Sequence, residues 1–400
     1  MNRTVDVLIV GAGPAGLALA ARLAAAGGAG RVEVLERERE AGGAPRHCHH
    51  GLGWDTARPL RSLLHGPAYA RELTDTAVDA GADVRTGVSA TGWAGPLTLE
   101  ATSPAGLERI TARTVILATG ARERPRSARL VPGSRPAGVF TTGELQQWVH
   151  LHGGSVGRRA VVVGAEPVAR HAVRTLRHAG ADVVAMVTDR PRARALPGVP
   201  LLTDTTVAEL RGRGSLSGVA VRHRDGRSGV LACDTVVFTG DWIPDHELAR
   251  RGGVPLDGGT RGPCVDASFR TRTPGVFAVG NALRGVERAA TAASEGAAAA
   301  PSVLAHLAGA PWPDPGPLLV VRAPLVWVTP NRVTGDAGRP LRLRSGEPLT
   351  CPVVTVEQDG RRLWRRRIPR PVSPSRSLRL PAGWTARVDR SGGPVVVSVA

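Results

Sequence analysis

The chain contains no lysine and very few aromatic residues. All 52 basic residues in its 400 are arginine, the formal net charge is +18, and Phe, Trp and Tyr make up 3% of the sequence. Binders of single-stranded nucleic acid depend on aromatic side chains that stack against bases. We therefore expect no nucleic acid partner, and we interpret most of the arginines as a solvated surface.

Paired cysteines and long apolar runs are also missing. The four cysteines are far apart and form no CxxC motif, which excludes a redox pair or zinc knuckle of that kind. The most apolar segment, residues 289–310, carries Glu295, Pro301 and His306 and is a poor candidate for a membrane span. Because an apolar strand begins at Val5, we expect no removable leader and a cytoplasmic location.

A glycine motif stands near the start of the chain. The apolar run 5–10 leads into Gly-Ala-Gly-Pro-Ala-Gly at 11–16, and a helical stretch, 17–26, follows. A second apolar run, 32–35, ends at Glu36, twenty residues after Gly16. A strand, glycine turn, helix, strand and acidic residue at this spacing predict a dinucleotide site.

Each position in this motif has a physical reason. Gly11 permits the tight turn, Gly13 lets the backbone approach a pyrophosphate, and Gly16 lets the helix pack closely on the strand. The helix N-terminus offers free N–H groups to the phosphates. Glu36 can accept hydrogen bonds from a ribose diol.

The same pattern returns in damaged form about 150 residues later. The strand 160–163 leads into Gly164, Ala165 and Glu166, a helix follows, and a strand 183–187 ends before Asp189. Glu166 stands where the first motif has Gly13, so its side chain hinders a close backbone approach and its charge repels a pyrophosphate. Asp189 favours NAD over NADP if a nucleotide binds. We prefer a structural βαβ unit without tight NAD binding.

The pattern along the chain predicts an α/β protein with two Rossmann-like FAD/NAD(P)-binding domains, the second inserted in the first, and a small C-terminal all-β sandwich-like domain. The expected boundaries are 1–150 (first part of the FAD-binding domain), 151–250 (the degenerate NAD(P)-binding-like domain), 251–310 (the return segment), 311–317 (a Pro-rich linker) and 318–400 (the β domain). A helix is expected over 288–300, ended or kinked by Pro301. Strands are expected at 318–328, 350–358, 363–368, 377–380, 385–388 and 395–399, with a hairpin turn at Asp359-Gly360.

This order of motifs resembles the two-dinucleotide-binding-domain flavoproteins of the pyridine nucleotide-disulfide oxidoreductase type, over about residues 5–310. The resemblance implies FAD as cofactor and NAD(H) as a possible second one. It also implies FAD contacts at Gly11, Gly13, Pro14, Ala15, Gly16, Glu36, Arg37, Gly43, Val88, Ala118, Thr119, Gly120, Gly280 and Asn281. Asn281 replaces the usual aspartate and removes a negative charge beside the phosphates.

A narrower resemblance is carried by residues 42–53, 66–71, 120–125 and 132–143. These segments are similar to FAD subunits of multi-subunit amino-acid, opine and sarcosine dehydrogenases and to flavoproteins linked to glycerol 3-phosphate oxidation. This branch implies that the partner is a second flavoprotein or an iron–sulfur subunit.

The loop His47-Cys48-His49-His50 falls where disulfide reductases of this type carry their redox cysteines. With one cysteine, an internal dithiol cycle is excluded. His47, Cys48 and His49 could line the active site, with histidine as acid or base and Cys48 as a thiolate. The loop could instead be a polar support for FAD or, least favoured, a metal site.

The arginines near the flavin side, Arg122, Arg124 and Arg126, and the cluster at 361–367 are interpreted as structural or solvated. For Arg122, Arg124 and Arg126 the alternative is that they bind an anionic substrate or partner. For the cluster at 361–367 the alternative is docking to an acidic electron-transfer partner or a membrane surface.

The sequence thus predicts an FAD-dependent oxidoreductase, a dehydrogenase-type flavoprotein or flavoprotein subunit that oxidises a small amine, amino acid or polyol phosphate and passes electrons to a partner. One alternative is an NAD(P)H-dependent flavin reductase. Another is a non-enzymatic, flavin-bearing docking scaffold.

Overall fold

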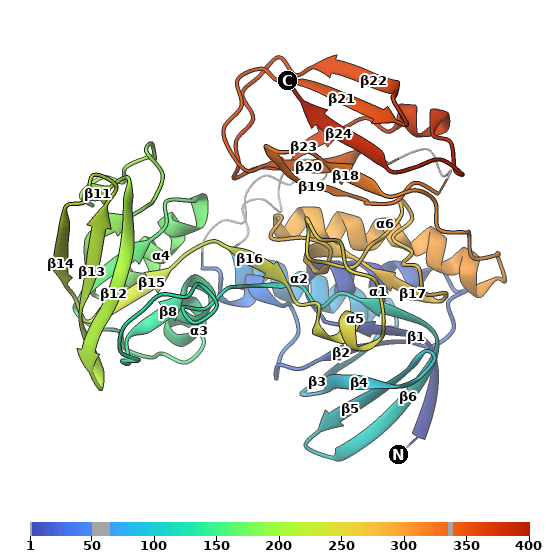
Figure 1. The fold of residues 1–400 in the computed structure, drawn as a ribbon. Helices are drawn as coiled ribbons and strands as arrows, with labels where there is room; N and C mark the ends of the chain where they lie inside the picture. Colours follow the sequence, from blue (N-terminus) through green and yellow to red (C-terminus); the bar gives the residue numbers. More distant parts are fainter. Residues whose placement is uncertain (1, 50–64, 335–338) are drawn as a thin grey trace. The chain divides into compact units, whose positions relative to one another are not determined.

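A computed structural model describes residues 2–49, 65–334 and 339–400, and the chain divides into two compact units (Figure 1). Unit 1 comprises Met1–Arg46, Gly51–Ala121 and Ile243–Ala400. Unit 2 comprises His47–His50 and Arg122–Trp242. The second unit is therefore inserted in the first, as the sequence pattern predicts.

A seven-stranded sheet forms the centre of unit 1. Its parallel part has the order β3-β2-β1-β6, and β17 also pairs with β6. Strands β5 and β4 continue the sheet as an antiparallel meander. The strands are β1 (Asn2–Val10), β2 (Val32–Glu36), β3 (Asp83–Thr86), β4 (Ser89–Gly95), β5 (Thr98–Ser103), β6 (Gly106–Leu117) and β17 (Val276–Ala278).

Strand β6 takes part in both portions of this sheet. Its first half pairs antiparallel with β5, and its last residues, Val115 to Leu117, pair parallel with β17 on the same side. Along its other side it pairs with β1. The buried carboxyl end of β6 is thereby brought level with the end of β1, where the first glycine turn begins.

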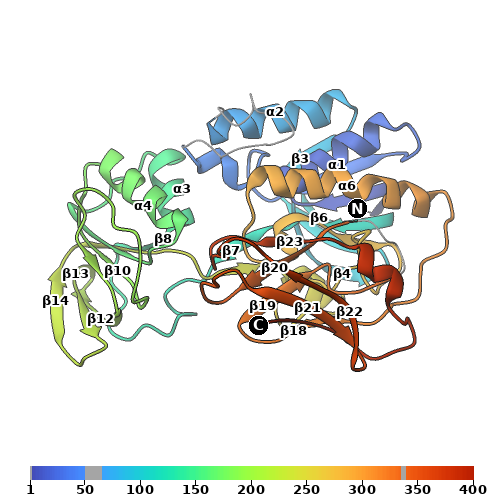
Figure 2. The same cartoon turned by 90° about the horizontal axis from the view of Figure 1, so that it is seen from above.

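Helices of unit 1 pack against one another beside this sheet. Helix α1 (Pro14–Ala25) contacts both α2 (Gly66–Asp79) and α6 (Ala289–Leu307) (Figure 2). The prediction was that Pro301 ends or kinks this helix. Helix α6 continues through Pro301, so the first alternative was wrong. Proline removes only one N–H and the helix is held by packing along its length, with Ala299, Ala300 and Val303 buried. The shorter helices are η1 (Ala44–His47), η3 (Gly280–Ala282) and α5 (Glu247–Arg251).

The C-terminal part of unit 1 forms two small sheets around a core of its own. One has the order β18-β24-β21-β22 and the other β19-β20-β23. The strands are β18 (Leu319–Val321), β19 (Leu325–Thr329), β20 (Leu341–Ser345), β21 (Val353–Gln358), β22 (Arg361–Arg367), β23 (Leu378–Leu380) and β24 (Val395–Val399). We call this part the sandwich.

Four of the six strands predicted for the sandwich are confirmed, as β21, β22, β23 and β24. The predicted strand at 318–328 is instead two strands, β18 and β19, which lie in different sheets and are separated by residues 322–324. The predicted strand at 385–388 is wrong, because residues 383–387 form the 3₁₀ helix η4 (Gly383–Arg387) around the buried Trp384. Strand β20 was not predicted, although Leu341 and Leu343 alternate with arginines. The hairpin turn is confirmed: Asp359 and Gly360 both have positive φ, 48° and 77°, between the antiparallel strands β21 and β22.

Unit 2 is built on a five-stranded parallel sheet with the order β11-β10-β9-β15-β8. Its strands are β8 (Val139–Thr141), β9 (Arg159–Val163), β10 (Asp182–Val187), β11 (Leu201–Leu202) and β15 (Thr235–Phe238). Helices α3 (Thr142–His150) and α4 (Pro167–His178) pack on one another. Two further short strands, β7 (Ala121–Glu123) and β16 (Trp242–Pro244), pair with each other.

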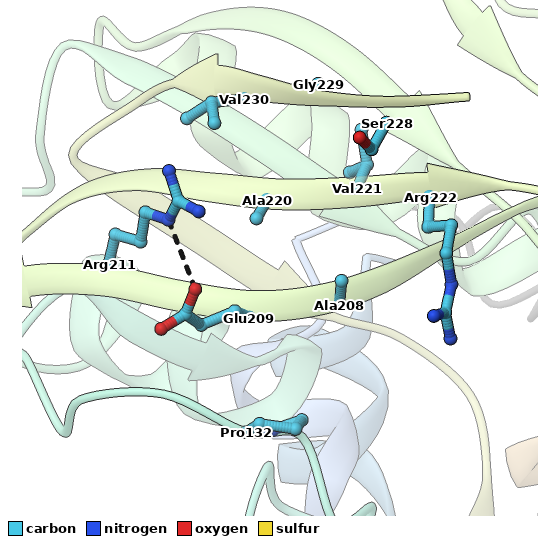
Figure 3. A pocket seen from close by; sticks show the side chains of 10 residues that line it. All are labelled: Pro132, Ala208, Glu209, Arg211, Ala220, Val221, Arg222, Ser228, Gly229 and Val230. Carbon is cyan, nitrogen blue, oxygen red and sulfur yellow. Dashed lines mark hydrogen bonds and ion pairs between the residues drawn. The ribbon is translucent and has the colours of Figure 1, made fainter. Parts of the chain in front are cut away.

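A three-stranded meander of β12 (Thr205–Arg213), β13 (Ser215–His223) and β14 (Ser228–Ala232) completes unit 2. Figure 3 shows a shallow depression on it, where Glu209 and Arg211 form an ion pair of 3.2 Å. This meander repeats β4-β5-β6 of unit 1. In unit 1 the last meander strand runs on into the parallel sheet, whereas in unit 2 Cys233 and Asp234 separate β14 from β15.

The division into units differs from the boundaries expected from the sequence. Residues 122–150 belong to unit 2 rather than to the first segment, because β8 pairs with β15 and α3 packs on α4. Unit 1 resumes at residue 243 instead of 251 and includes the sandwich. The linker 311–317 has no helix or strand, in agreement with its four prolines.

Candidate functional site

The first glycine turn is built so closely that only glycine fits at two positions. Gly11 has φ +107°, and a Cβ there would lie 2.5 Å from the carbonyl oxygen of Ala118 at the end of β6. A Cβ at Gly16 would overlap the carbonyl oxygen of Gly11. The glycines therefore bring β1, α1 and β6 into backbone contact, as the sequence motif predicts.

Gly13 differs from its two neighbours because the space beside it is open. A Cβ at Gly13 would meet no atom within 4 Å. Gly13 is the N-cap of α1, Pro14 stands at the first helical position, and the first turn has no acidic residue and no side-chain cap. Open space beside a helix N-terminus without a side-chain cap fits the pyrophosphate of a dinucleotide.

The Glu36 carboxylate lies at the end of β2 and holds the turn. Its Oε2 accepts a hydrogen bond from the Ala12 N–H and its Oε1 accepts one from the Glu38 N–H, both at 3.0 Å. Burial raises the pKa of Glu36, against the lowering effect of these hydrogen bonds and of Arg37. Each oxygen retains a second lone pair, so the carboxylate can order the turn and still accept a ribose hydroxyl. The Val88 N–H donates to the Glu36 carbonyl at 2.9 Å, which fixes the predicted adenine-side segment.

Two other glycine segments meet the turn from distant parts of unit 1. The Gly42 N–H donates to the Ala12 carbonyl at 2.7 Å, and a Cβ at Gly43 would lie 2.9 Å from the Cα of Gly13. A Cβ at Gly280 would lie 2.6 Å from the Cβ of Ala15. The structure thus brings the first motif, the 42–43 segment and the late Gly280-Asn281 segment together, and we call this assembly the glycine cradle.

Helix α6 closes the cradle through a glycine that sequence reasoning missed. A Cβ at Gly296 would overlap the carbonyl oxygen of Ala15, so α6 crosses α1 at backbone contact. A single Gly in an alanine-rich helix is the signal that could have marked this crossing.

The carboxyl end of β6 carries the predicted residues Ala118, Thr119 and Gly120. The Ala118 N–H donates to the Val10 carbonyl at 2.9 Å. The Thr119 hydroxyl donates to the Asp245 carbonyl at 2.6 Å, and the Asp245 N–H donates to the Gly120 carbonyl at 2.9 Å. Arg37 reaches the Asp245 carboxylate at 3.6 Å. These contacts shape the strand end and occupy the Thr119 hydroxyl hydrogen.

Asn281 closes its own loop. Its Oδ1 accepts from the Glu287 N–H at 2.9 Å and its Nδ2 donates to the Glu287 carbonyl at 3.2 Å. An aspartate could accept the first bond but could not donate the second. Asparagine in place of the usual aspartate thus gives the loop a second hydrogen bond.

The second glycine turn, in unit 2, is filled by its own glutamate. Glu166 Oε2 accepts from the Thr239 hydroxyl at 2.9 Å, and a Cβ at Gly240 would lie 2.8 Å from the Glu166 carboxyl carbon. A Cβ at Gly164 would lie 2.6 Å from Glu166 Oε2. Where Gly13 leaves open space in unit 1, the equivalent position in unit 2 places a carboxylate at the N-terminus of α4. Asp189 is exposed after β10, and Ala165 is half-buried.

The described part of the predicted catalytic loop lies in unit 2, and His50 falls outside the described residues. Cys48 Sγ is 3.7 Å from Gln146 Oε1 on α3. Burial, together with the nearby Glu123, raises the pKa of Cys48 to about 12. A reactive cysteine has a lowered pKa, so this shift disfavours the thiolate hypothesis for Cys48. His49 stacks on His150, with ring centroids 4.1 Å apart. Across the described ranges, no group of three His, Cys, Asp or Glu side chains could hold a metal ion.

A buried carboxyl that sequence reasoning missed lies near this loop. Glu123 accepts from the Gly240 N–H at 3.0 Å and from the Gly143 N–H at 2.9 Å. Burial raises its pKa to about 7, although these two bonds oppose the shift. Nothing in the local pattern distinguishes it from the exposed acids around it. Arg124 and Arg126 bond to backbone carbonyls of the 128–133 loop, which favours their structural interpretation.

The nested Rossmann-like units and the intact glycine cradle define a dinucleotide-binding oxidoreductase of the flavoprotein class. The model of the pyridine nucleotide-disulphide oxidoreductase family matches residues 5–296. The chain belongs to this family, and its cofactor is FAD.

Curated relatives include subunits of larger oxidases. The chain is 29% identical over 344 residues to the alpha subunit of sarcosine oxidase from Rhizobium meliloti, covering 79% of this chain and 32% of that one. It is 30% identical to the corresponding protein of a Corynebacterium species, covering 83% and 36%. It is 26% identical to the A subunit of opine oxidase from Agrobacterium tumefaciens, covering 76% and 66%. The chain thus spans about a third of the length of the two sarcosine oxidase subunits.

The solved structures agree on the fold. The thioredoxin reductase of T. acidophilum is 25% identical, with a TM-score of 0.61, over 76% of this chain and 99% of that one. Among helices in the described ranges, none is both long and apolar enough to cross a membrane.

Proposed function

We propose that this chain is an FAD-dependent dehydrogenase-type flavoprotein, or the flavoprotein subunit of a larger oxidase, that takes electrons from a small organic substrate. The observation that carries this proposal is the contrast between the two glycine turns. The turn at Gly13 is open, whereas Glu166 fills the turn where a nicotinamide cofactor would bind. A family member with only the first site usable takes its electrons from somewhere other than NAD(P)H.

In this proposal the glycine cradle holds FAD. The amides of α1 and the backbone at Gly13 face the pyrophosphate, and Glu36 accepts from the adenosine ribose. Gly43, Gly280 and the end of β6 line the cradle from the other sides. Bound FAD supplies the redox chemistry by accepting a hydride, and the protein supplies binding, orientation and electrostatics.

The substrate class follows from the relatives. Sarcosine oxidase and opine oxidase subunits are the curated proteins that this chain matches over most of its length. A small secondary amine or amino acid is therefore the favoured substrate, ahead of a polyol phosphate. Because these relatives are subunits, a second flavoprotein or an iron–sulfur subunit is the proposed electron acceptor. A cytoplasmic location is also proposed, supported by four cysteines that all carry free thiols.

Cys48 is not the nucleophile in this proposal, and no cysteine pair stores electrons. Glu123, with a pKa of about 7, is the carboxyl near Cys48 in unit 2.

The test is an anaerobic reduction of the purified holoprotein. The visible spectrum should show bound FAD, and the flavin band should bleach with a secondary amine or amino acid from a panel that includes sarcosine, opines and glycerol 3-phosphate. NADH and NADPH should leave the band unchanged. Rapid bleaching by NADH would establish the reductase instead. A colourless protein that FAD cannot reconstitute would contradict both.

A further inference from the structure

The sandwich contributes a buried group of charges to the segment that approaches the glycine cradle. Arg284, between η3 and α6, is 1% exposed, and its Nη2 lies 2.5 Å from Glu295 Oε1 on α6. Arg342 on β20 reaches the same oxygen with its Nε at 3.2 Å. Arg342 of the sandwich and Arg284, which lies outside the sandwich, thus both bind the Glu295 carboxylate.

A second carboxylate, on Glu287, completes the group. Arg344 on β20 lies 3.5 Å from Glu287 Oε1 and donates to the Val286 carbonyl at 3.2 Å. Arg342 Nη1 lies 3.8 Å from Glu287 Oε2. We call Arg284, Glu287, Glu295, Arg342 and Arg344 the charge network.

One tryptophan of the sandwich, Trp327, makes cation–π contacts with two arginines of the charge network. The guanidinium carbons of Arg284 and Arg344 lie 5.8 Å and 5.1 Å from the ring centroid of Trp327 on β19. Two planar cations against one buried ring restrict both side chains to a narrow range of positions.

The charge network is joined to the cradle at both of its ends. Glu287 is the residue whose backbone is held by Asn281, the neighbour of Gly280. Glu295 directly precedes Gly296, which contacts the backbone of Ala15. The arginines of the sandwich therefore hold the segment 280–296 through Glu287 and Glu295. Gly280 and Gly296, which are connected to these two glutamates, contact Ala15 in the cradle.

Stability alone is a weak reason for such a network. Within the described residues, Glu295 Oε2, Arg284 Nε and Arg344 Nε are buried without a hydrogen bond. Desolvating five charges costs free energy that their mutual attraction often fails to recover, and apolar residues of similar size serve a core at least as well. Charged groups with a fixed geometry instead hold the elements that carry them, here β20 and the segment 280–296, in a defined position.

We infer that the charge network positions the 280–296 segment against the FAD, which makes the sandwich a structural part of the cofactor site. Arg342 and Arg344 are positioning residues that act through Glu287 and Glu295. This inference rests on the proposed function, because it takes the glycine cradle as the FAD site.

The test compares Arg344→Ala with two matched variants of the full-length protein. Leu343→Ala removes a fully buried side chain from the same strand without touching the charge network, and Arg365→Ala removes the same charge from an exposed position on β22. FAD affinity of each apoprotein is measured by titration of flavin fluorescence. The shape of the visible flavin band and the thermal midpoint are recorded alongside.

Arg344→Ala should bind FAD about tenfold more weakly, which corresponds to about 1.4 kcal/mol, and should change the flavin band. Leu343→Ala should lose thermal stability and keep both the affinity and the band, and Arg365→Ala should resemble the wild type. Glu287→Gln combined with Arg344→Ala should weaken binding by much less than the product of the single effects, because both act through one contact.

Unchanged FAD affinity in Arg344→Ala, or equal weakening by Leu343→Ala, would overturn the inference and leave the proposed function intact. A wild-type protein that binds no FAD would overturn the proposed function and the inference with it.

Discussion

Replacing Glu166 with glycine should open the second dinucleotide turn. Glu166 fills the space beside Gly164 and Gly240 and carries a negative charge where a pyrophosphate would lie. Two unit charges 4 Å apart interact by about 4 kcal/mol at an effective dielectric constant of 20. Glu166 is half-buried, so solvent screens its charge in part, and we take about half of this repulsion energy. Removing the charge should then favour NADH binding by ~2 kcal/mol, or roughly thirtyfold in affinity.

The cost to the fold should be small. The substitution removes the hydrogen bond from Thr239, worth about 1 kcal/mol. Glu166 makes no side-chain cap to α4, and glycine is an acceptable N-cap residue. Glu166→Gly should therefore fold and should bind NADH at least thirtyfold more tightly than the wild type, since it gains space as well as losing charge.

The assay is a titration of NADH fluorescence against the wild type, Glu166→Gly and Glu166→Gln. The glutamine variant loses the charge and keeps the bulk, so it should recover only part of the gain. Asp189→Asn in the glycine background should reduce the gain if that carboxylate holds the ribose. A folded Glu166→Gly protein with no better NADH binding, or a wild type that already binds NADH in the low micromolar range, would refute the reasoning.

Three further predictions concern the cradle and the loop of unit 2. Gly13→Ala should lower the thermal midpoint only slightly, because the new methyl meets no protein atom and alanine is merely a poorer N-cap residue than glycine. The same change should weaken FAD binding at least tenfold, and equal affinity in a flavin titration would show that no ligand approaches Gly13. The pKa of Glu123 is about 7 in the folded protein, above the ordinary value of 4.5. Its protonated form therefore stabilises the fold, and this contribution is fully present below about pH 4.5. The contribution, up to about 3 kcal/mol, is lost as the pH rises through 7. Urea unfolding at pH 5 and pH 8 should therefore show a smaller decrease in Glu123→Gln than in the wild type, and parallel decreases would contradict the assignment. At pH 8 only about one Cys48 thiol in ten thousand should be ionised, so iodoacetamide should label it far more slowly in the folded than in the unfolded protein, as mass spectrometry can measure.

Local patterns predicted the central elements of the parallel sheets, but not β8 or β11. The strand before Gly11, the helix after Gly16 and the repeat at Gly164 are all confirmed, because buried strands and glycine turns leave a dense local signal. The position of Gly280 beside Ala15 could be expected only through the resemblance, since residues 265 apart in the chain meet through tertiary packing.

Errors arose where tertiary contacts decide the outcome. Residues 385–388 have strand-forming composition, but Thr385 bonds back to the Ala382 carbonyl with both its N–H and its hydroxyl, which completes a 3₁₀ turn. Pro301 is tolerated because α6 is held by its neighbours. The raised pKa values of Cys48 and Glu123 come from burial that no sequence window reveals.

The close crossings at Gly11, Gly16 and Gly296 mean that the glycine cradle is shaped by main-chain atoms. A site made of backbone presents the same hydrogen-bond donors whatever the surrounding side chains are. Few amino-acid substitutions can therefore change which ligand the site binds. The equivalent turn in unit 2 illustrates the opposite case, since the side chain of one glutamate fills the space beside Gly164 and Gly240. Divergence in a protein of this design should therefore accumulate in the second turn and the loops, while the first turn tolerates almost no change.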